Sequence, residues 1–312
     1  MQYKTVYRIV FVWVLLIALV ALFGDVSVAA SDGGRTAADF LQIGIGAKPA
    51  GMGGAYTAVS RGAEASYWNP AGLAGMEGGE ISLGHFSWYQ DLNLEHGSFA
   101  IALSPRATLA ASMTYLNYGT IQGFDATGNP TGNITAYDWA GALSLGVSLS
   151  DNIALGLTGK FINQKLDEIT GTGFAADVGL RFQTDRFAFA VVGTNLGPDM
   201  KFESTSEKLP SAARVGLAFA PFSQSVLTSL EYEKRIYGNA VMRQGLEFNF
   251  DGQYFLRTGY NLYLQDESET IGTGIAFGAG LHLNKLAFDY AYTLQDKYSG
   301  DDLHRFSLGF RF

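Results

Sequence analysis

The side chains that could carry out catalysis are few and scattered in this chain of 312 residues. The four histidines are His85, His96, His282 and His304, and none stands in a recognisable motif with a serine, aspartate or glutamate. Covalent catalysis needs a nucleophile held next to a base, and no such pairing can be read here. Cysteine is absent, which removes disulfides, thiolate metal sites and a lipid-bearing cysteine. We therefore predict a non-enzymatic protein with no cofactor, no resident metal and no nucleic-acid partner.

Acidic residues form a second group with possible chemistry. The net charge is −8, and segments that we predict to be long loops contain Asp266, Glu267, Glu269, Asp301 and Asp302. Hard oxygen ligands suit calcium, but the spacing matches no defined calcium loop. Two alternatives stay open: a solvated acidic surface, which we favour, and cation binding or steering.

A third group of charged residues lies at alternate positions within otherwise apolar segments. Its members are Asp138, Asp177, Arg181, Arg214, Glu231, Glu247, Arg257 and Asp289. Successive side chains of a strand point to opposite faces, and a basic residue facing lipid at the bilayer midplane costs about 2–4 kcal/mol. We expect these charges to face a lumen, and their mixed signs suggest that they partly pair with one another.

Such charges need strands to position them, and alternating segments are frequent after Gly79. Tilted strands of about 9–11 residues can cross a bilayer. We predict strands at residues 79–87, 94–103, 107–118, 134–149, 153–165, 173–183, 186–195, 211–219, 225–235, 241–250, 253–262, 271–283, 285–294 and 303–312.

The connections between these segments alternate between tiny turns, such as 104–106 and 184–185, and longer loops, such as 119–133 and 196–210. Outer-membrane barrels show this pattern, with the short turns on the periplasmic side. The last segment, LHRFSLGFRF, should close the barrel against residues 79–87, and Phe312 should be the signal that the barrel assembly machinery recognises. The predicted fold class is all-β: a transmembrane antiparallel β-barrel of about 14 strands with an N-terminal hatch in its lumen.

The first residues predict export from the cytoplasm. Lys4 and Arg8 precede an apolar run at 9–23, which is followed by small residues. A run of this length is short for a spanning helix and typical of a cleaved signal peptide. We predict a signal peptide at 1–30, a hatch or plug at 31–78 and the barrel at 79–312. The expected location is a Gram-negative-type outer membrane, with its lipid and lipopolysaccharide as surroundings.

The hatch segment contains two notable stretches, GGAYTAV at 53–59 and ASYWNPAGLA at 65–74. From its composition alone, Asn69-Pro70-Ala71-Gly72 reads as an ordinary Asn-Pro turn. The two stretches resemble the N-terminal signature of the PorV/PorQ family, within the wider FadL-like group of outer-membrane barrels. The resemblance implies that Asn69, Pro70, Ala71 and Gly72 belong to a hatch folded into the barrel. This chain departs from the best-known members, which serve the type IX secretion system, in being shorter with modest outer loops.

Two functions follow from these patterns. The main prediction is an outer-membrane protein of PorV/PorQ type that acts in transport or in protein secretion and surface assembly, with secretion-system components as partners. In that reading, loops 119–133 and 196–210 are the contact surface, with Phe124 and Phe202 as exposed anchors. The alternative is a FadL-like channel for small hydrophobic molecules such as fatty acids, whose hatch blocks free diffusion.

Overall fold

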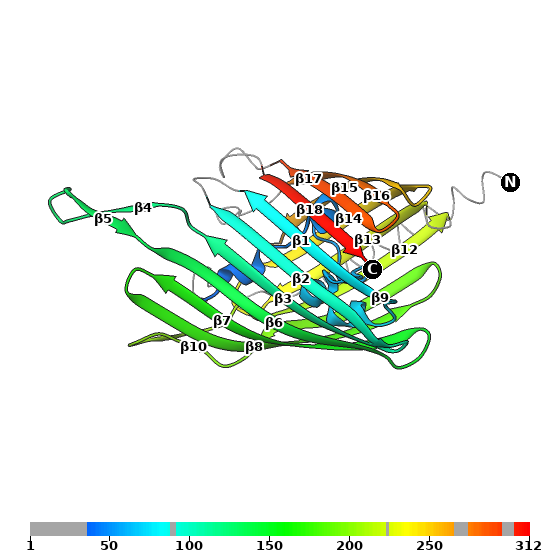
Figure 1. The fold of residues 1–312 in the computed structure, drawn as a ribbon, viewed down its shortest axis with the longest axis horizontal. Coiled ribbons are helices and arrows are strands. Elements are labelled where there is room, and N and C mark those ends of the chain that lie inside the picture. The colour runs from blue at the N-terminus through cyan, green and yellow to red at the C-terminus, as the bar shows by residue number, and fades with distance from the viewer. Residues whose placement is uncertain (1–35, 88–91, 223–224, 265–273, 295–302) are drawn as a thin grey trace. The chain divides into compact units, whose positions relative to one another are not determined.

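Fourteen long antiparallel strands dominate the computed structural model, which describes residues 36–87, 92–222, 225–264, 274–294 and 303–312 (Figure 1). They are β1 (Gly79–Ser87), β2 (Asn93–Ser104), β3 (Ala107–Asn117), β6 (Ala136–Ser148), β7 (Ile153–Leu166), β8 (Ile169–Gln183), β9 (Phe187–Leu196), β12 (Ala212–Phe222), β13 (Val226–Arg235), β14 (Ala240–Phe250), β15 (Tyr254–Tyr263), β16 (Ile275–Leu283), β17 (Leu286–Thr293) and β18 (Leu303–Arg311). All fourteen lie within a few residues of the predicted segments, which confirms the predicted barrel.

The sheet closes on itself, so it has no long unpaired edge. The first and last strands pair from Glu80 opposite Arg311 to Ser87 opposite His304. Strands β8 and β9 also pair, with an irregularity between Ala176 and Val178, and this completes the ring. The prediction that LHRFSLGFRF closes the barrel against 79–87 is therefore confirmed.

The two faces of the strands differ because side chains alternate between them. On the outer face, large apolar residues remain exposed, for example Leu83, Leu143 and Phe174 at 52%, 65% and 62%. A soluble protein seldom exposes so large a continuous apolar surface, whereas a lipid-facing barrel wall requires it. The inner face carries glycine, alanine, hydroxyl groups and most of the buried charges.

The connections sort the barrel into two ends. Tight turns such as 105–106 and 284–285 lie at one end, which we call the short-turn end, and the longer connections lie at the other, the long-loop end. Two of the tight turns use backbone with positive φ, at Asp251 (φ 55°) and Asn284 (φ 54°). Asp and Asn tolerate this conformation better than most residues do.

The predicted loop 119–133 contains a hairpin of its own, β4 (Ile121–Phe124) and β5 (Pro130–Ile134), which projects beyond β3 and β6 (Figure 1). At its tip Asp125 accepts hydrogen bonds from Thr127 and Asn129, which lower the pKa of its carboxyl to about 2. Two very short strands, β10 (Met200–Lys201) and β11 (Ser206–Glu207), form a smaller ribbon in the predicted loop 196–210.

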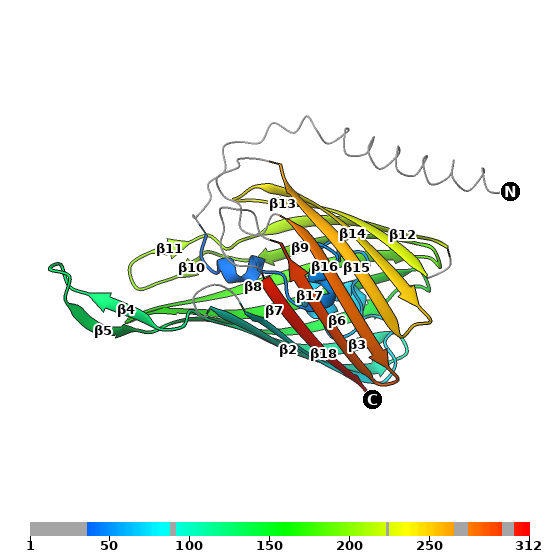
Figure 2. The same cartoon turned by 90° about the horizontal axis from the view of Figure 1, so that it is seen from above.

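Residues before β1 fold into short helices inside the ring of strands. These are η1 (Asp39–Gln42), α2 (Ala47–Gly51), α3 (Ala65–Trp68) and η2 (Pro70–Leu73). We call the described part of this segment, residues 36–78, the hatch; both ribbon views show it enclosed by the strands (Figures 1 and 2). Residues Gly33–Phe312 form one unit by their contacts, and the predicted signal peptide lies outside the described residues. Among the described helices, none has the length and apolar character to cross a membrane.

Candidate functional site

The Asn69–Gly72 turn is the most tightly specified part of the hatch. The amide of Ala71 donates to Asn69 Oδ1 at 3.0 Å, and Asn69 Nδ2 donates to the carbonyl oxygen of Thr57 at 3.1 Å. The Asn69 side chain therefore caps η2 and ties it to an earlier loop of the hatch. All four residues of the turn are buried, and Pro70 starts the helix with a φ that is already suitable.

A row of three glycines in the barrel wall receives this turn. Gly146 of β6 lies opposite Gly156 of β7, which lies opposite Gly179 of β8. A Cβ atom at Gly156 would overlap the backbone of Pro70 and Ala71, and one at Gly179 would overlap Asn69. Backbone and hatch touch here because none of the three wall residues has a side chain.

On another part of the wall, buried charges hold the hatch. Glu231 of β13 accepts hydrogen bonds from the amides of Tyr56 and Thr57, at 3.2 and 2.8 Å. Arg243 of β14 donates to Glu231 at 3.1 Å and to Glu233 at 3.0 Å. Glu231 and Glu233 are each 1% exposed, so these bonds form away from bulk water.

The same network extends around Glu233, which also receives Arg214 Nε and Arg235 Nε at 2.7 Å each. The Arg214 guanidinium lies over the ring of Trp68 in the hatch, 5.4 Å from its centre. A second chain of charges runs along β14, β15 and β17. Lys48 of α2 lies 3.6 Å from Glu247, and Arg257 bridges Glu247 and Asp289 at 2.6 Å each.

The remaining predicted inner charges meet different partners. Asp177 pairs with Lys160 at 2.7 Å, and Asp138 accepts from Tyr118 at 2.8 Å and Gln164 at 2.9 Å. Arg181 donates to the carbonyl oxygen of Ser60 at 3.0 Å. The structure thus places all eight predicted charges on the inner side of the wall, in two networks and three separate contacts instead of one site.

Several members of these groups escaped the sequence prediction, among them Arg243 and Lys160 in the strands. Arg243 and Lys160 each carry an ion pair inside the barrel. The sequence contains the signal for both residues, which is an even spacing from positions on the inner face. Arg243 stands two residues before Gly245 and four before Glu247, and Lys160 stands two residues after Thr158. Each therefore shares the inner register of its strand.

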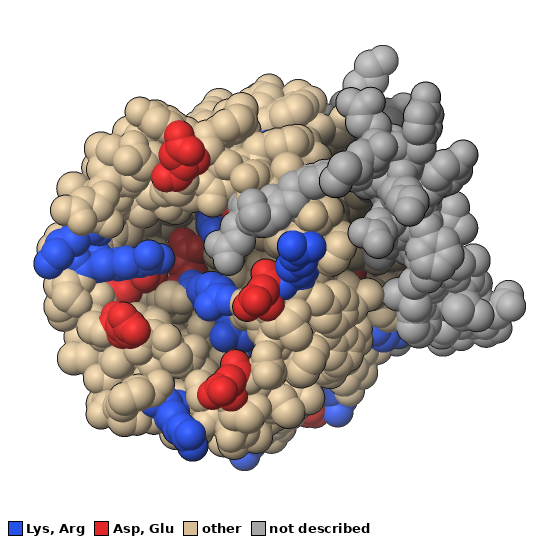
Figure 3. Space-filling model, turned by 90° about the vertical axis from the view of Figure 1, so that its right-hand side faces the viewer, with Lys and Arg blue, Asp and Glu red and all other residues tan. Residues whose placement is uncertain are grey.

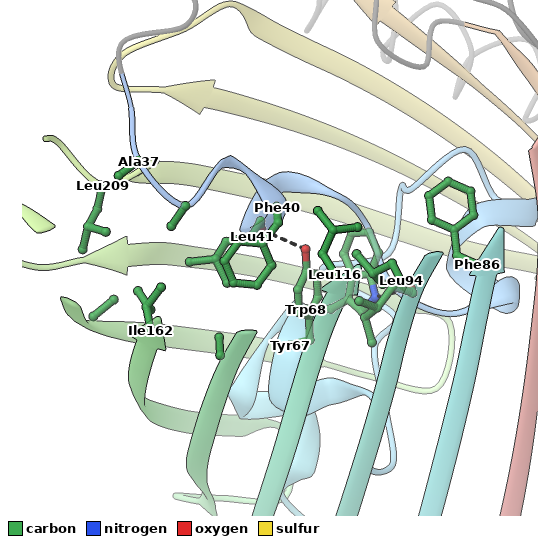
Figure 4. Packing of buried hydrophobic residues seen from close by; sticks show 14 of the residues in the cluster. Ala37, Phe40, Leu41, Tyr67, Trp68, Phe86, Leu94, Leu116, Ile162 and Leu209 are labelled. Atoms are coloured by element: carbon green, nitrogen blue, oxygen red, sulfur yellow. Dashed lines mark hydrogen bonds between the residues drawn. The ribbon is translucent and has the colours of Figure 1, made fainter. Parts of the chain in front are cut away.

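Toward the long-loop end, the contact between hatch and wall changes character and becomes apolar (Figure 4). We define the apolar cluster by its larger members, which are Phe40, Leu41, Tyr67 and Trp68 of the hatch and Phe86, Leu94, Leu116 and Ile162 of the wall. The four wall residues stand near the ends of β1, β2, β3 and β7 that adjoin the long connections.

Polar atoms within the apolar cluster are satisfied by the hatch itself. The Tyr67 hydroxyl lies 2.9 Å from the carbonyl oxygen of Leu41 (Figure 4). It also lies 2.7 Å from the carbonyl oxygen of Ile43. Trp68 Nε1 donates to the carbonyl oxygen of Ile45 at 3.2 Å. Both aromatic residues are therefore fixed by one end and present ring surface to the wall.

The two proposed docking aromatics have different environments. Phe124, on the projecting hairpin, is 60% exposed. The prediction that Phe202 is an exposed anchor is wrong, because its ring covers Gly171 and packs against the apolar cluster. Residues 266–269 and 301–302, for which calcium binding was considered, lie outside the described residues. In the part of the chain that the structure describes, no three His, Asp or Glu side chains converge as metal ligands would.

The terminal aromatic, Phe312, lies on the outer face at the short-turn end. Its backbone exchanges two hydrogen bonds with Gly79, at 2.9 and 3.0 Å. Its ring is 48% exposed and stacks near Phe99 and Phe310. Phe312 is thus held in the sheet by its backbone, with its aromatic side chain directed outward.

An end-on view of the molecule, from the side of the short turns, shows charged side chains gathered toward the middle of the visible face (Figure 3). Most of its visible rim is formed by uncharged residues (Figure 3). This distribution matches the inner placement of the charges and the apolar outer wall.

Comparisons with known proteins agree with this architecture. A family model described as "Uncharacterised protein family (UPF0164)" matches residues 21–312. Among curated proteins, no match was found.

Several solved structures share the fold. The Ralstonia pickettii toluene transporter TbuX is similar with a TM-score of 0.60 and 14% identity, over 86% of this chain and 98% of that one. The P. putida toluene transporter TodX has a TM-score of 0.58 and 12% identity, over 86% and 99%. A Pseudomonas aeruginosa FadL homologue has a TM-score of 0.57 and 10% identity, over 85% and 98%. At these identities the likeness concerns the fold, and none of these structures bears the PorV/PorQ name that the sequence suggested.

Proposed function

The chain belongs to the family described as "Uncharacterised protein family (UPF0164)", and from this premise we propose that it is an outer-membrane channel for small hydrophobic molecules. The observation that carries the proposal is the apolar cluster between hatch and wall at the long-loop end. This was the alternative among the two functions that the sequence suggested. It is preferred over the secretion role because the cluster lies inside the lumen, where a passing molecule would meet it.

A hydrophobic molecule can enter the apolar cluster at little cost in free energy. A guest that separates Phe40 or Leu41 from Leu116 or Ile162 replaces one apolar contact by another, so the free energy changes little. A strongly hydrated solute would have to lose its water at the same place without gaining hydrogen bonds. The cluster therefore favours apolar guests, while the hatch keeps the lumen closed to water-soluble molecules.

Similar folds support this proposal. Two of the similar structures are described as toluene transporters and one as a FadL homologue. An outer-membrane location also fits the exposed apolar wall and the outward ring of Phe312, which we propose as the assembly signal. Removing Phe312 should lower the amount of folded barrel in the membrane, measured by heat-dependent gel mobility, while export across the inner membrane continues.

Uptake by whole cells tests the channel. Cells that express the protein should accumulate labelled toluene faster than cells that lack it. Ile162→Asn, which places a buried amide in the apolar cluster, should reduce uptake, and the conservative Ile162→Val should preserve it. Equal uptake with and without the protein would refute the proposal.

A second candidate function is favoured by one specific observation, the projecting β4–β5 hairpin. It stands beyond the barrel, carries exposed Phe124 and has a tip organised by Asp125 (Figure 1). A two-stranded hairpin is only marginally stable alone, and a binding partner would stabilise it. We propose docking in secretion or surface assembly as this second function. A stoichiometric protein that co-purifies with the wild type but not with Phe124→Ser would support it.

A further inference from the structure

One buried cation of the barrel lacks the carboxylate that the others have. Among the described residues, the buried lysines and arginines are Lys160, Arg181, Arg214, Arg243 and Arg257. All except Arg181 form ion pairs with Asp or Glu at 2.6–3.1 Å. Arg181 is 6% exposed, and within the same described part of the chain it has only one hydrogen-bond partner, the carbonyl oxygen of Ser60 at 3.0 Å.

The wall around Arg181 offers no other polar group in its register. Its neighbours on the adjacent strands are Ala154 of β7 and Ala190 of β9, which present only methyl groups. Arginine has five N–H donors in a planar fork, and a carbonyl oxygen occupies one of them here. An enclosed guanidinium with unused donors and no counter-charge is the arrangement expected of a site for an anion.

A second arginine, which belongs to the hatch, comes directly after Ser60, whose carbonyl oxygen accepts the hydrogen bond from Arg181. This residue, Arg61, is exposed and carries a positive charge. Within the described residues it forms no ion pair. Two carboxylates of this stretch already have partners: Glu64 accepts from the Ser82 hydroxyl at 3.2 Å, and Glu80 accepts from the Ala63 amide at 2.9 Å and from Arg311 at 2.8 Å.

We infer that Arg61 and Arg181 form a binding site for an oxyanion, a phosphate or carboxylate group, toward the short-turn end of the hatch. Two guanidinium forks can hold such a group by paired hydrogen bonds, and the bound charge relieves their mutual repulsion. Ser60 and Arg61 lie only a few residues from Thr57, which Glu231 holds through its amide.

The site would link the anion to the position of the hatch. Arg181 belongs to the wall and Arg61 to the hatch, so one anion bound by both joins the two parts. The inference deepens the proposed function, because it predicts that the channel favours amphiphiles with an anionic head group over purely apolar molecules. The same chemistry could serve free phosphate, and an experiment has to separate these two sources.

Equilibrium binding to the purified full-length protein in non-ionic detergent tests the site. The probes are inorganic phosphate, dodecyl phosphate and the uncharged dodecanol, measured by calorimetry. Arg61→Gln and Arg181→Gln should each weaken the binding of dodecyl phosphate by about tenfold, the usual effect of losing one charge-assisted hydrogen bond. Arg186→Gln, in the β8–β9 turn at the same end, is the matched control and should bind like the wild type.

The outcomes separate the possibilities. Binding of inorganic phosphate that both variants weaken assigns the site to a free anion, whereas a preference of at least tenfold for dodecyl phosphate assigns it to an amphiphile. If dodecyl phosphate binds both variants as tightly as the wild type, the inference is wrong. If Arg181→Gln fails to fold, the binding of dodecyl phosphate to Arg61→Gln, whose substitution lies at an exposed position, decides the result. Dodecanol that does not bind while phosphate does would count against the channel proposal and leave this site standing.

Discussion

The hatch meets the barrel in two different ways, and the contrast indicates how a plugged barrel could still pass a molecule. Toward the long-loop end the contact is apolar, with Phe40 and Leu41 against Leu116 and Ile162. Farther along the wall it consists of directed polar bonds, such as those from the amides of Tyr56 and Thr57 to Glu231.

These two kinds of contact have different tolerance for change. Hydrogen bonds and ion pairs depend on distance and angle, so the polar region fixes the hatch in one position. Apolar contacts are weak individually and non-directional, so the apolar cluster can exchange partners without a large cost. The polar region would therefore hold the hatch in place while the apolar cluster receives the guest.

The largest effect is expected where the hatch lies against bare wall backbone. Gly156→Val would force a side chain into the space occupied by Pro70 and Ala71, so the hatch should be unable to dock. We expect at least about 3 kcal/mol of lost docking free energy, measured as faster deuterium exchange in hatch peptides. Gly159→Val on the same strand is the control, because nothing lies within 4 Å of its Cβ position. Equal protection in both variants would contradict this account of the glycine row.

Much of the barrel could be predicted from the sequence because its rules are local. Alternation sets which face each residue occupies, and tight turns such as Asp251-Gly252 mark where strands reverse. The closing pair of β1 and β18 followed from the same alternation, combined with the need to leave no free edge.

The hatch contacts could not be predicted in this way. Glu231 and the amide of Thr57 are 174 residues apart, and a glutamate inside a barrel has several possible partners. Phe202 was mistaken for an exposed anchor because a loop sequence does not reveal that Gly171 leaves room for its ring. The hairpin β4–β5 falls within the predicted loop 119–133, because its Gly123 and Gly132 interrupt the apolar alternation.

Weakening the polar contact between the hatch and Glu231 should have a smaller effect on docking. Glu231→Gln keeps the shape but removes the negative charge that faces Arg243 and receives two hatch amides. Docking of the hatch should weaken by about 2 kcal/mol, the usual cost of losing charge-assisted hydrogen bonds. Faster deuterium exchange in peptides that contain residues 56–57 would measure this weaker docking. Glu95→Gln, an exposed glutamate of β2, should leave exchange unchanged; faster exchange there as well would show that the effect is not specific to Glu231.

The smallest effect concerns the hatch residue Glu64. Burial, together with the charges of Asp289 and Glu80, raises the pKa of Glu64 from 4.5 to about 7, against the opposing influence of Ser82 and Lys48. Between these values the docked hatch keeps a proton that an undocked hatch would release, so docking should weaken as the pH rises through this window. We expect a change of about 1 kcal/mol after allowing for screening, seen as faster exchange of hatch peptides at pH 8 than at pH 5.

Correction for the intrinsic exchange rate is needed in that comparison. Glu64→Gln is the matched variant, because it has the same shape and no titrating group. It should show the same corrected protection at both pH values. A pH dependence that persists in Glu64→Gln would assign the titration to another group.

The most direct test of the central claim is whether an apolar molecule reaches Trp68. The chain has four tryptophans, so replacing Trp13, Trp88 and Trp139 by Phe leaves Trp68, inside the apolar cluster, as the only tryptophan. A second protein that keeps only Trp139, whose ring packs against Phe161 on the wall, reports the quencher dissolved in the detergent. We predict saturable quenching of Trp68 by 4-bromotoluene, competed by toluene and weakened by Ile162→Asn, and non-saturable quenching of Trp139. Quenching of Trp139 with no saturable quenching of Trp68 would contradict the proposal that the apolar cluster receives hydrophobic molecules.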